Sequence, residues 1–189
     1  EGFLGITCSH GTLHLNEDLM VIQKHYLDQK SGRFLPIITD LNYRSQPLIR
    51  YCLDDILIER KKPCPCGSIL TAVQQIEGRY HDIFYLPNSQ NKKLIRIFPN
   101  QIRQIILTET PEIESYQVIQ KNLHLIEIYL KGFQGQFSQR QERINNSFQK
   151  LFLSQGAIPP KILYYSDEYP GESDGKLRRI KREFSLNWE

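Results

Sequence analysis

Short apolar runs separated by turn-forming residues fill the first part of the chain. Residues 11–27 contain β-favourable runs, and the DQKSGR segment that follows is rich in turn formers, so the pattern predicts a hairpin. FLPIITDL at 34–41 and DILIER at 55–60 predict two further strands. Short strands and turns continue to about residue 76, which indicates part of a β-barrel or sandwich.

The pattern changes after Gly78. HDIFYLP and KLIRIFP flank a polar insert and predict a second hairpin, and the apolar spacing after Asn100 predicts a short helix that this residue caps. A strand pair is expected at 115–131 and a last strand at 161–166. A basic tail, GKLRRIKREF, follows.

One longer helix is expected at 137–155, ending at Gly156. Its apolar positions share one face, namely Phe137, Ile144, Phe148, Leu151 and Phe152. The order ββαββαβ describes a small α+β domain, with the boundary to the first, β-rich part near 77–82.

Composition and charge exclude several classes of protein. The 189 residues include 40% hydrophobic and 24% charged residues, as in an ordinary soluble globular protein. No apolar run approaches the roughly 20 residues of a membrane span, and the start of the chain does not resemble a signal peptide. The net charge of +3 is spread along the chain, which does not demand a nucleic-acid partner. Four cysteines are too few for a disulfide scaffold, so a reducing, cytoplasmic compartment is expected.

A possible metal site is the sharpest local signal. Cys64-Pro-Cys66-Gly67 is a knuckle that can direct two thiolates at one point, and Cys8 with one histidine would complete a tetrahedral zinc site. Spacing favours His14 only weakly over His10. Four protein ligands leave no open position, so such a zinc would be structural. The alternative is free core cysteines and surface histidines.

Two further segments carry residues suited to a nucleotide. An aspartate at a strand edge, Asp54 or Asp55, can accept the hydroxyls of a ribose, and Arg79 can donate to ribose or phosphate oxygens. Near the end of the chain, Gly175 leaves room for a close approach and Lys176 can direct a charge at a phosphate. Taken singly, these residues are more typical of solvated ion pairs and of a basic tail than of a nucleotide site.

Read in order, these segments resemble the C-terminal portion of the adenylate-forming superfamily, which includes the acyl-CoA ligases and luciferases. The resemblance is strongest to the phenylacetate-CoA ligase and CoF synthetase branch. It covers nearly the whole chain and rests on six motifs: EG at 1–2, CSHGTLHLNED at 8–18, PLIRYCLDD at 47–55, CPCG at 64–67, EGRYHD at 77–82 and DGKLRR at 174–179.

The resemblance implies a role for each matching residue. Glu1 would hold Mg²⁺ against the ATP phosphates, Asp55 would bind the ribose, and Arg79 would contact the ribose near the domain boundary. Lys176 would stabilise the α-phosphate during adenylation. The implied zinc ligands are Cys8, His14, Cys64 and Cys66, and the implied hinge is Tyr80, His81 and Asp82.

The resemblance also implies two domains. Residues 1–79 would be the end of the large adenylating domain, a β-barrel-like subdomain with a zinc knuckle, and residues 80–189 a mobile α+β lid. His81 replaces the usual aspartate of the hinge, and Cys52-Leu53-Asp54 stands where Arg-Thr-Arg is common. The segment after the hinge lacks the glycine that lines a thiol tunnel in CoA ligases, which favours the CoF synthetase-like relatives.

The expected function is therefore that of the C-terminal part of an ATP-dependent, AMP-forming enzyme. The complete protein would activate a carboxylate or adenylylate a deazaflavin-type coenzyme. Its partners would be a nucleotide, a small-molecule acceptor and the missing N-terminal part of the same enzyme, without which this chain would be inactive. The alternatives are a non-catalytic zinc-binding interaction module or degenerate remnant and, more weakly, a nucleic-acid-binding protein that uses the tail at 176–183.

Overall fold

A computed structural model describes residues 4–40, 47–91, 93–132, 137–166 and 178–186. The chain divides into two compact units, Glu1–Tyr80 and His81–Glu189. Each is described by itself below, as unit 1 and unit 2. None of the helices among the described residues has the length and apolarity needed to cross a membrane.

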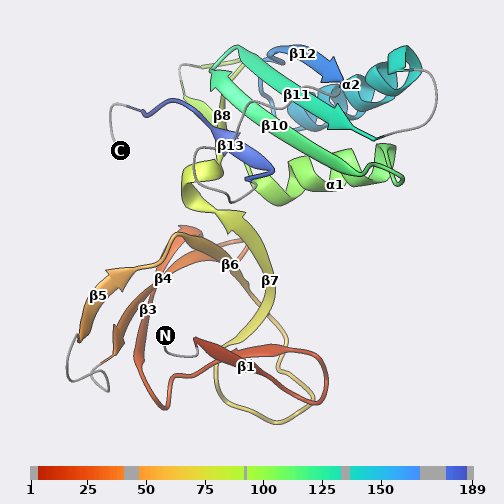
Figure 1. Cartoon of the computed structure of the whole chain (residues 1–189). Coiled ribbons are helices and arrows are strands. Elements are labelled where there is room, and N and C mark those ends of the chain that lie inside the picture. Colours follow the sequence, from red (N-terminus) through yellow and green to blue (C-terminus); the bar gives the residue numbers. More distant parts are fainter. Residues whose placement is uncertain (1–3, 41–46, 92, 133–136, 167–177, 187–189) are drawn as a thin grey trace. The chain divides into compact units, whose positions relative to one another are not determined.

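Unit 1 is a curled sheet of antiparallel strands (Figure 1). The strands follow the order β1-β2-β7-β6-β4-β3, and β5 pairs with β4. They are β1 (Gly5–Thr7), β2 (Leu13–Leu15), β3 (Val21–Asp28), β4 (Arg33–Asp40), β5 (Leu48–Cys52), β6 (Asp55–Glu59) and β7 (Ala72–Arg79).

The hairpin of β3 and β4 turns at Gly32, whose φ of 77° lies in the left-handed region that glycine enters without strain. A Cβ at this position would meet the Glu59 carbonyl oxygen at 3.1 Å, so glycine is also needed for the close approach of β6. The predicted turn is confirmed. By contrast, β5 was not predicted as a separate strand.

Two kinds of contact stabilise unit 1. Its apolar cluster consists of Leu15, Phe34, Leu57 and Val73. A buried ion pair joins β4 to β7: Arg33 donates from Nε to Glu77 Oε2 at 2.5 Å and from NH2 to Oε1 at 2.9 Å. The Glu77 side chain is 2% exposed, so its charge depends on this fork for compensation.

Unit 2 contains a mixed sheet, a separate hairpin and two helices (Figure 1). The sheet order is β12-β11-β10-β13, in which β11 pairs antiparallel with β10 and parallel with β12. The elements are β8 (Phe84–Pro87), β9 (Leu94–Ile97), α1 (Pro99–Glu109), β10 (Ser115–Asn122), β11 (Leu125–Lys131), α2 (Phe137–Ser154), β12 (Lys161–Ser166) and β13 (Ile180–Arg182).

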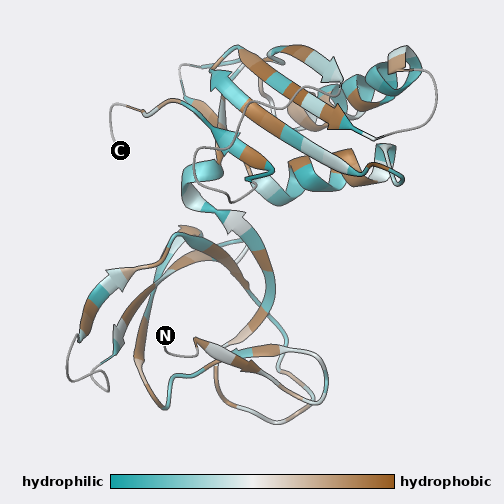
Figure 2. Ribbon diagram, in the orientation of Figure 1, coloured by the Kyte–Doolittle hydropathy of each residue, from teal (hydrophilic) through white to brown (hydrophobic). Residues whose placement is uncertain are grey.

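The core of unit 2 lies between the helices and the strands. Apolar residues from α1, α2, the hairpin and β10 and β11 form one cluster, and Figure 2 shows them along the strands and helices. The three residues Ile144, Phe148 and Phe152 are fully buried, so the predicted apolar face of 137–155 is confirmed. Gly156 follows with φ 75° and donates to the Leu153 carbonyl at 3.0 Å, which ends the helix.

Two predictions about unit 2 are wrong. Asn100 is not the N-cap of α1, because Pro99 already occupies the first turn and the cap is Phe98, whose N–H donates to Gln101 Oε1 at 3.0 Å. The basic tail after the last predicted strand contains a further strand, β13, which pairs parallel with β10. The predicted order ββαββαβ lacks this element.

Candidate metal centre and nucleotide-binding strand pair

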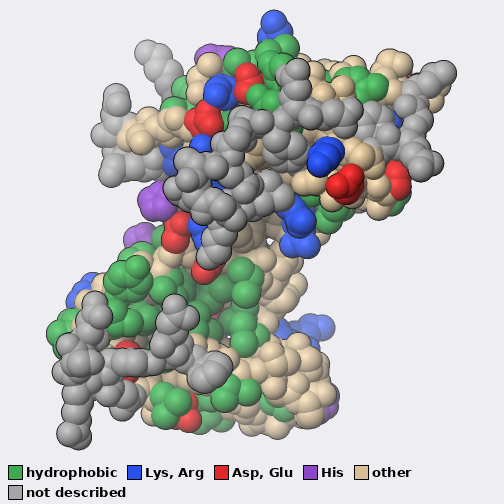
Figure 3. Space-filling view, in the orientation of Figure 1, with side chains coloured by type: hydrophobic (Ala, Val, Ile, Leu, Met, Phe, Trp, Pro, Cys, Tyr) green, Lys and Arg blue, Asp and Glu red, His purple; other side chains and the backbone are tan. Residues whose placement is uncertain are grey.

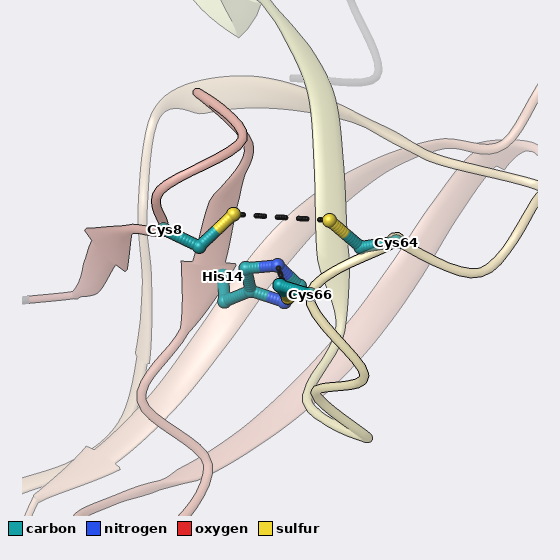
Figure 4. A group of neighbouring side chains, drawn as sticks. All are labelled: Cys8, His14, Cys64 and Cys66. Atoms are coloured by element: carbon teal, nitrogen blue, oxygen red, sulfur yellow. Dashed lines mark hydrogen bonds between the residues drawn. The ribbon is translucent and has the colours of Figure 1, made fainter.

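Four side chains from separate parts of unit 1 point toward one another (Figure 4). Cys8 follows β1, His14 lies in β2, and Cys64 and Cys66 lie between β6 and β7. Their ligand atoms are all within 4.8 Å of one another. The sequence named these four residues, and the fold brings them together.

Local turns direct the ligands. Gly11 and Gly67 have φ of 71° and 78° and form tight turns, in which Gly11 donates to the Cys8 carbonyl at 2.9 Å and Gly67 to the Cys64 carbonyl at 3.1 Å. The pairing of His14 with Ala72 in register places the knuckle beside β2. Both segments thus direct their ligand atoms toward the same point.

Hydrogen bonds hold both ends of the loop that contains the Cys64–Gly67 knuckle. Arg60 donates to Thr12 Oγ1 at 2.9 Å. At the other end, the Glu17 carboxylate accepts from the Thr71 N–H at 2.6 Å and from its hydroxyl at 2.8 Å. The sequence analysis missed these supporting residues, since their pairing depends on the contact of β2 with β7.

The distances fit a tetrahedral zinc ion. Cys8 Sγ and Cys64 Sγ are 3.7 Å apart, and Cys66 Sγ is 3.3 Å from His14 Nε2. Ligands at about 2.3 Å (sulfur) and about 2.0 Å (nitrogen) from a tetrahedral zinc lie roughly 3.8 Å (S–S) and roughly 3.5 Å (S–N) apart. These two distances are within about 0.2 Å of the values for ligands of a bound zinc ion.

His14, and not His10, is the histidine of the cluster. The His14 side chain is buried, and its Nδ1 donates to the Leu70 carbonyl at 3.2 Å, which leaves Nε2 free to bind a metal. His10 is exposed and lies beside Ser9 Oγ. The choice that spacing left open is settled by burial.

The thiols differ in acidity. The hydrogen bond with the Thr12 side chain, together with the Cys66 backbone and the His14 side chain, lowers the pKa of Cys64 to about 5. The pKa of Cys66 is raised: a backbone hydrogen bond at Ser68 lowers it, but burial and the neighbouring thiols Cys64 and Cys8 outweigh this. A metal must displace the Cys66 proton, so we expect affinity to rise with pH.

The two residues assigned to the nucleotide face each other across a strand pair. Asp55 begins β6, Arg79 ends β7, and their Cα atoms are register partners. Both are exposed. A carboxylate and a guanidinium side by side can accept from ribose hydroxyls and donate to phosphate or ribose oxygens. Glu1 and Lys176 lie outside the described residues.

The predicted hinge is a 3-10 helix, η1 (Tyr80–Asp82), directly after Arg79. His81 is exposed, while the Asp82 carboxylate is buried and pairs with the guanidinium of Arg178. Arg178 was missed as a separate residue by the sequence analysis. The signal was present in the arginines of DGKLRR, read there only as part of a motif.

Comparison with known proteins gives the fold. No protein-family model and no curated protein match the sequence. A 2-hydroxyisobutyryl-CoA ligase in the postadenylation state with 2-HIB-AMP matches 95% of this chain, with a TM-score of 0.64 and 17% identity. Its complex with R3-HIB-AMP matches 91%, with a TM-score of 0.63 and 16% identity.

An open conformation of that ligase with 2-HIB-AMP and CoA matches 92% of the chain, with a TM-score of 0.54 and 17% identity. The chain spans 38% to 39% of the length of these ligase chains. This chain therefore shares the fold of a segment that makes up about two fifths of a CoA ligase.

Proposed function

We propose that this chain is the C-terminal part of an ATP-dependent, AMP-forming ligase or adenylyltransferase. The observation that carries the proposal is the match of 95% of the chain to a ligase that holds an acyl adenylate, 2-HIB-AMP. The six motifs of the sequence, in the order of the adenylate-forming superfamily, support it independently.

The strand pair supplies the nucleotide site in this proposal. The Asp55 carboxylate accepts the two ribose hydroxyls, and the Arg79 guanidinium opposite it donates to ribose or phosphate oxygens. By resemblance, Glu1 holds Mg²⁺ and Lys176 stabilises the charge that develops on the α-phosphate as pyrophosphate leaves. The substrate acid becomes an acyl adenylate.

The Cys8, His14, Cys64 and Cys66 cluster holds a structural zinc in this proposal. Zinc bound by four protein ligands has no open position for water or substrate, so it contributes stability rather than chemistry. All four cysteines are free, which agrees with the reducing, cytoplasmic compartment that we propose for the protein.

Beyond adenylation, the acceptor defines two versions of the proposal. The segment after η1, which contains the hairpin of β8 and β9, has no glycine, which favours a deazaflavin-type coenzyme as acceptor, as in CoF synthetase-like enzymes. The structural neighbours are named as CoA ligases, which favours a carboxylic acid and CoA. The remaining partner is the N-terminal part of the same enzyme.

A non-catalytic zinc-binding module is the second candidate. The observation in its favour is that the metal cluster is built entirely from unit 1 and needs no nucleotide residue. It predicts zinc binding with no effect of ATP.

The test is ATP–pyrophosphate exchange by the complete protein, offered carboxylic acids and deazaflavin coenzymes. Lys176→Ala and Asp55→Ala should each lower exchange by at least roughly 100-fold, since each removes a contact to the reacting nucleotide. The matched controls Lys150→Ala and Glu142→Ala, both exposed on α2, should leave exchange unchanged. Absence of exchange with every acceptor, or full activity of the first two variants, would overturn the proposal in favour of the zinc module.

A further inference from the structure

The candidate metal cluster brings two thiols from distant parts of the chain into contact. Cys8 Sγ and Cys64 Sγ are 3.7 Å apart, and a dashed line joins them in Figure 4. The third thiol, Cys66 Sγ, lies 3.3 Å from His14 Nε2. All three thiols are free. Two thiols at this distance are a candidate site for oxidation as well as for metal binding.

The pair of Cys8 and Cys64 needs little movement to form a bond. A disulfide bond is about 2.05 Å long, so the two sulfur atoms must approach each other by roughly 1.7 Å. The two side chains point toward each other in Figure 4 and come from turns, one closed by Gly11 and the other by Gly67. Small rotations about the Cα–Cβ bonds supply an approach of this size, because each Sγ swings on that bond. The two sulfur atoms are therefore within reach of each other.

Two of the three thiols are partly open to solvent. Cys8 and Cys66 are half-buried, whereas Cys64 is 5% exposed. Cysteines that bind zinc are thiolates, and a thiolate that solvent reaches reacts with hydrogen peroxide. A peroxide therefore reaches Cys8 from solvent, and Cys64 lies in contact behind it.

We infer that hydrogen peroxide converts Cys8 and Cys64 to a disulfide that replaces zinc as the cross-link of unit 1, an inference that rests on the structural zinc of the proposed function. The Cys8 thiolate attacks one peroxide oxygen, which gives a sulfenic acid and one hydroxide ion. The Cys64 thiolate then attacks the Cys8 sulfur and displaces a second hydroxide ion. Two thiolates thus lose two electrons, and one peroxide gains them. Of the four ligands, His14 and Cys66 remain, which is too few for a tetrahedral site, so the zinc ion leaves.

The disulfide joins the same two segments of unit 1 as the metal does. Cys8 lies in the turn after β1, and Cys64 lies 56 positions later, in the loop between β6 and β7. In the described part of the chain β2 pairs with β7 at two positions, so few ladder hydrogen bonds hold the β1–β2 hairpin to the sheet. A covalent cross-link between distant residues stabilises a fold by restricting the unfolded chain. The oxidised protein is therefore free of zinc and keeps unit 1 folded.

The alternative is a disulfide between Cys64 and Cys66, within the knuckle. The ligand atoms of these two residues are also within 4.8 Å of each other. Their disulfide links two positions of one loop and joins nothing to the β1–β2 hairpin. Oxidation would then release zinc and also break the connection between the two segments, as removal of the metal by a chelator does. The two products differ in their linked peptides and in the stability of the hairpin.

The first experiment titrates the zinc-loaded complete protein with hydrogen peroxide. Released zinc is measured with a chromogenic chelator, free thiols are alkylated, and linked peptides are identified by mass spectrometry after proteolysis. We expect about one zinc ion to be released for each disulfide formed, since the four ligands bind one ion. The linked peptides should contain Cys8 and Cys64, and Cys66 should be alkylated. Dithiothreitol with added zinc should restore the starting state.

Three variants separate the roles of the thiols. Cys66→Ser keeps Cys8 and Cys64, so the disulfide should still form, although zinc binding weakens. Cys8→Ser removes one partner of the disulfide, so peroxide should give no cross-link between the two segments. The control is Cys52→Ser, at an exposed cysteine outside the cluster, which should change neither the zinc release nor the disulfide.

Amide hydrogen exchange reports the cross-link without any assay of activity. The Leu15 N–H donates to the Thr71 carbonyl at 2.9 Å, a hydrogen bond between β2 and the end of the loop that contains the knuckle. Exchange of this amide should be at least roughly 10-fold slower in the oxidised, zinc-free protein than in reduced protein stripped of zinc by a chelator. The Ile128 amide of β11, in unit 2, should exchange at the same rate in both.

The outcomes separate the inference from the proposed function. Retention of zinc at peroxide concentrations that oxidise Cys52, or a disulfide other than that of Cys8 and Cys64, overturns the inference and leaves the structural zinc intact. Equally fast Leu15 exchange in the oxidised and the chelated protein overturns the replacement of the metal by the disulfide. Reduced wild-type protein that contains no zinc rejects the structural zinc, and the inference with it. ATP–pyrophosphate exchange by the zinc-loaded protein tests adenylation separately.

Discussion

The two units are stabilised by different kinds of contact. Unit 2 buries residues of two helices and several strands in one apolar cluster. Unit 1 has a small apolar cluster around Leu15, Phe34, Leu57 and Val73, to which it adds a metal-ligand cluster and a buried ion pair. A curled sheet without a covering helix among the described residues leaves less apolar area to bury, so polar links take a larger share of its stability.

The surface follows the same division. Among the described residues, unit 1 carries most of the exposed large apolar side chains, including Ile6, Val21, Ile49 and Ile76 at 57% to 66% exposed. Figure 3 shows apolar side chains gathered on the visible face of unit 1. Unit 2 exposes fewer, such as Leu153 on α2. Burial on unit 1 is thus less complete than on unit 2, as the proposed N-terminal part would require.

The largest expected effect comes from breaking the metal site. Cys64→Ser removes a thiolate ligand, and we expect loss of about one zinc per chain and of most of the stability of unit 1, since structural zinc contributes to folding directly. The measurement is metal analysis together with hydrogen exchange at Leu57 in β6 and Ile128 in β11, of which only Leu57 should lose protection. Cys52→Ser, at an exposed free cysteine outside the cluster, is the control. Metal-free wild-type protein of unchanged stability would contradict the prediction.

A cavity in the core of unit 2 should produce the converse result. Phe148 is fully buried on α2 and stacks on Phe152 with ring centres 5.5 Å apart. Phe148→Ala should lower the free energy of unfolding of unit 2 by about 3–5 kcal/mol and leave the zinc content unchanged. Leu153→Ala, on the exposed side of the same helix, should cost far less in the same denaturant titration. Equal losses of unfolding free energy in the two variants would show that the apolar cluster is not the main source of the stability of unit 2.

The buried ion pair of unit 1 should come next. Glu77→Gln removes the charge opposite Arg33 and should cost roughly 3 kcal/mol, because the partly buried guanidinium loses the closer of its ion pairs with Glu77 and Asp28 and keeps the longer one, with Asp28. Lys24→Gln, which breaks the more exposed pair with Glu59, should cost no more than about 1 kcal/mol. Chemical denaturation followed at unit 1 measures both. A smaller loss for Glu77→Gln than for Lys24→Gln would contradict this ranking.

The smallest expected effect is a loss of stability at low pH, which we expect in both units. In unit 1, burial raises the pKa of Glu59, but hydrogen bonds from Lys24 and Tyr26 outweigh it and lower the pKa below its ordinary value. In unit 2, the Lys121 hydrogen bond lowers the pKa of Glu183. A carboxylate with a lowered pKa stabilises the folded state above its unfolded pKa, about 4.3, and this contribution disappears as the pH falls through the folded value.

Stability should therefore decline below about pH 4.5 in both units, and Glu59→Gln should flatten that decline in unit 1 alone. Thermal unfolding between pH 3 and pH 7, roughly the range in which both carboxylates titrate, provides the measurement. A variant with the same acid profile as the wild type would exclude Glu59 as a source of the dependence.

The sequence pattern predicted those elements whose conformation depends mainly on residues nearby in the sequence. The helix at 137–155 was predicted from apolar spacing and a final glycine, and α2 is Phe137–Ser154. The three cysteines of the candidate metal cluster were also identifiable from the sequence, because a Cys-x-Cys knuckle with a further cysteine is typical of zinc sites.

Elements defined by distant pairing were not predictable in this way. β13 has three residues in a basic sequence and exists because β10 pairs with it. The choice between His10 and His14 depended on the burial of His14 where β2 pairs with β7. Asp82 pairs with Arg178, which is far from it in the sequence. Sequence spacing does not encode such contacts.

The central claim is that the strand pair of β6 and β7 binds the nucleotide of an adenylating enzyme. The most direct measurement is a crystal structure of the complete protein with a non-hydrolysable acyl adenylate. We predict that the Asp55 carboxylate accepts both ribose hydroxyls at roughly 2.6–3.2 Å and that Arg79 donates to the same nucleotide. A nucleotide bound away from Asp55 and Arg79, or no nucleotide at concentrations that saturate such enzymes, would contradict the account.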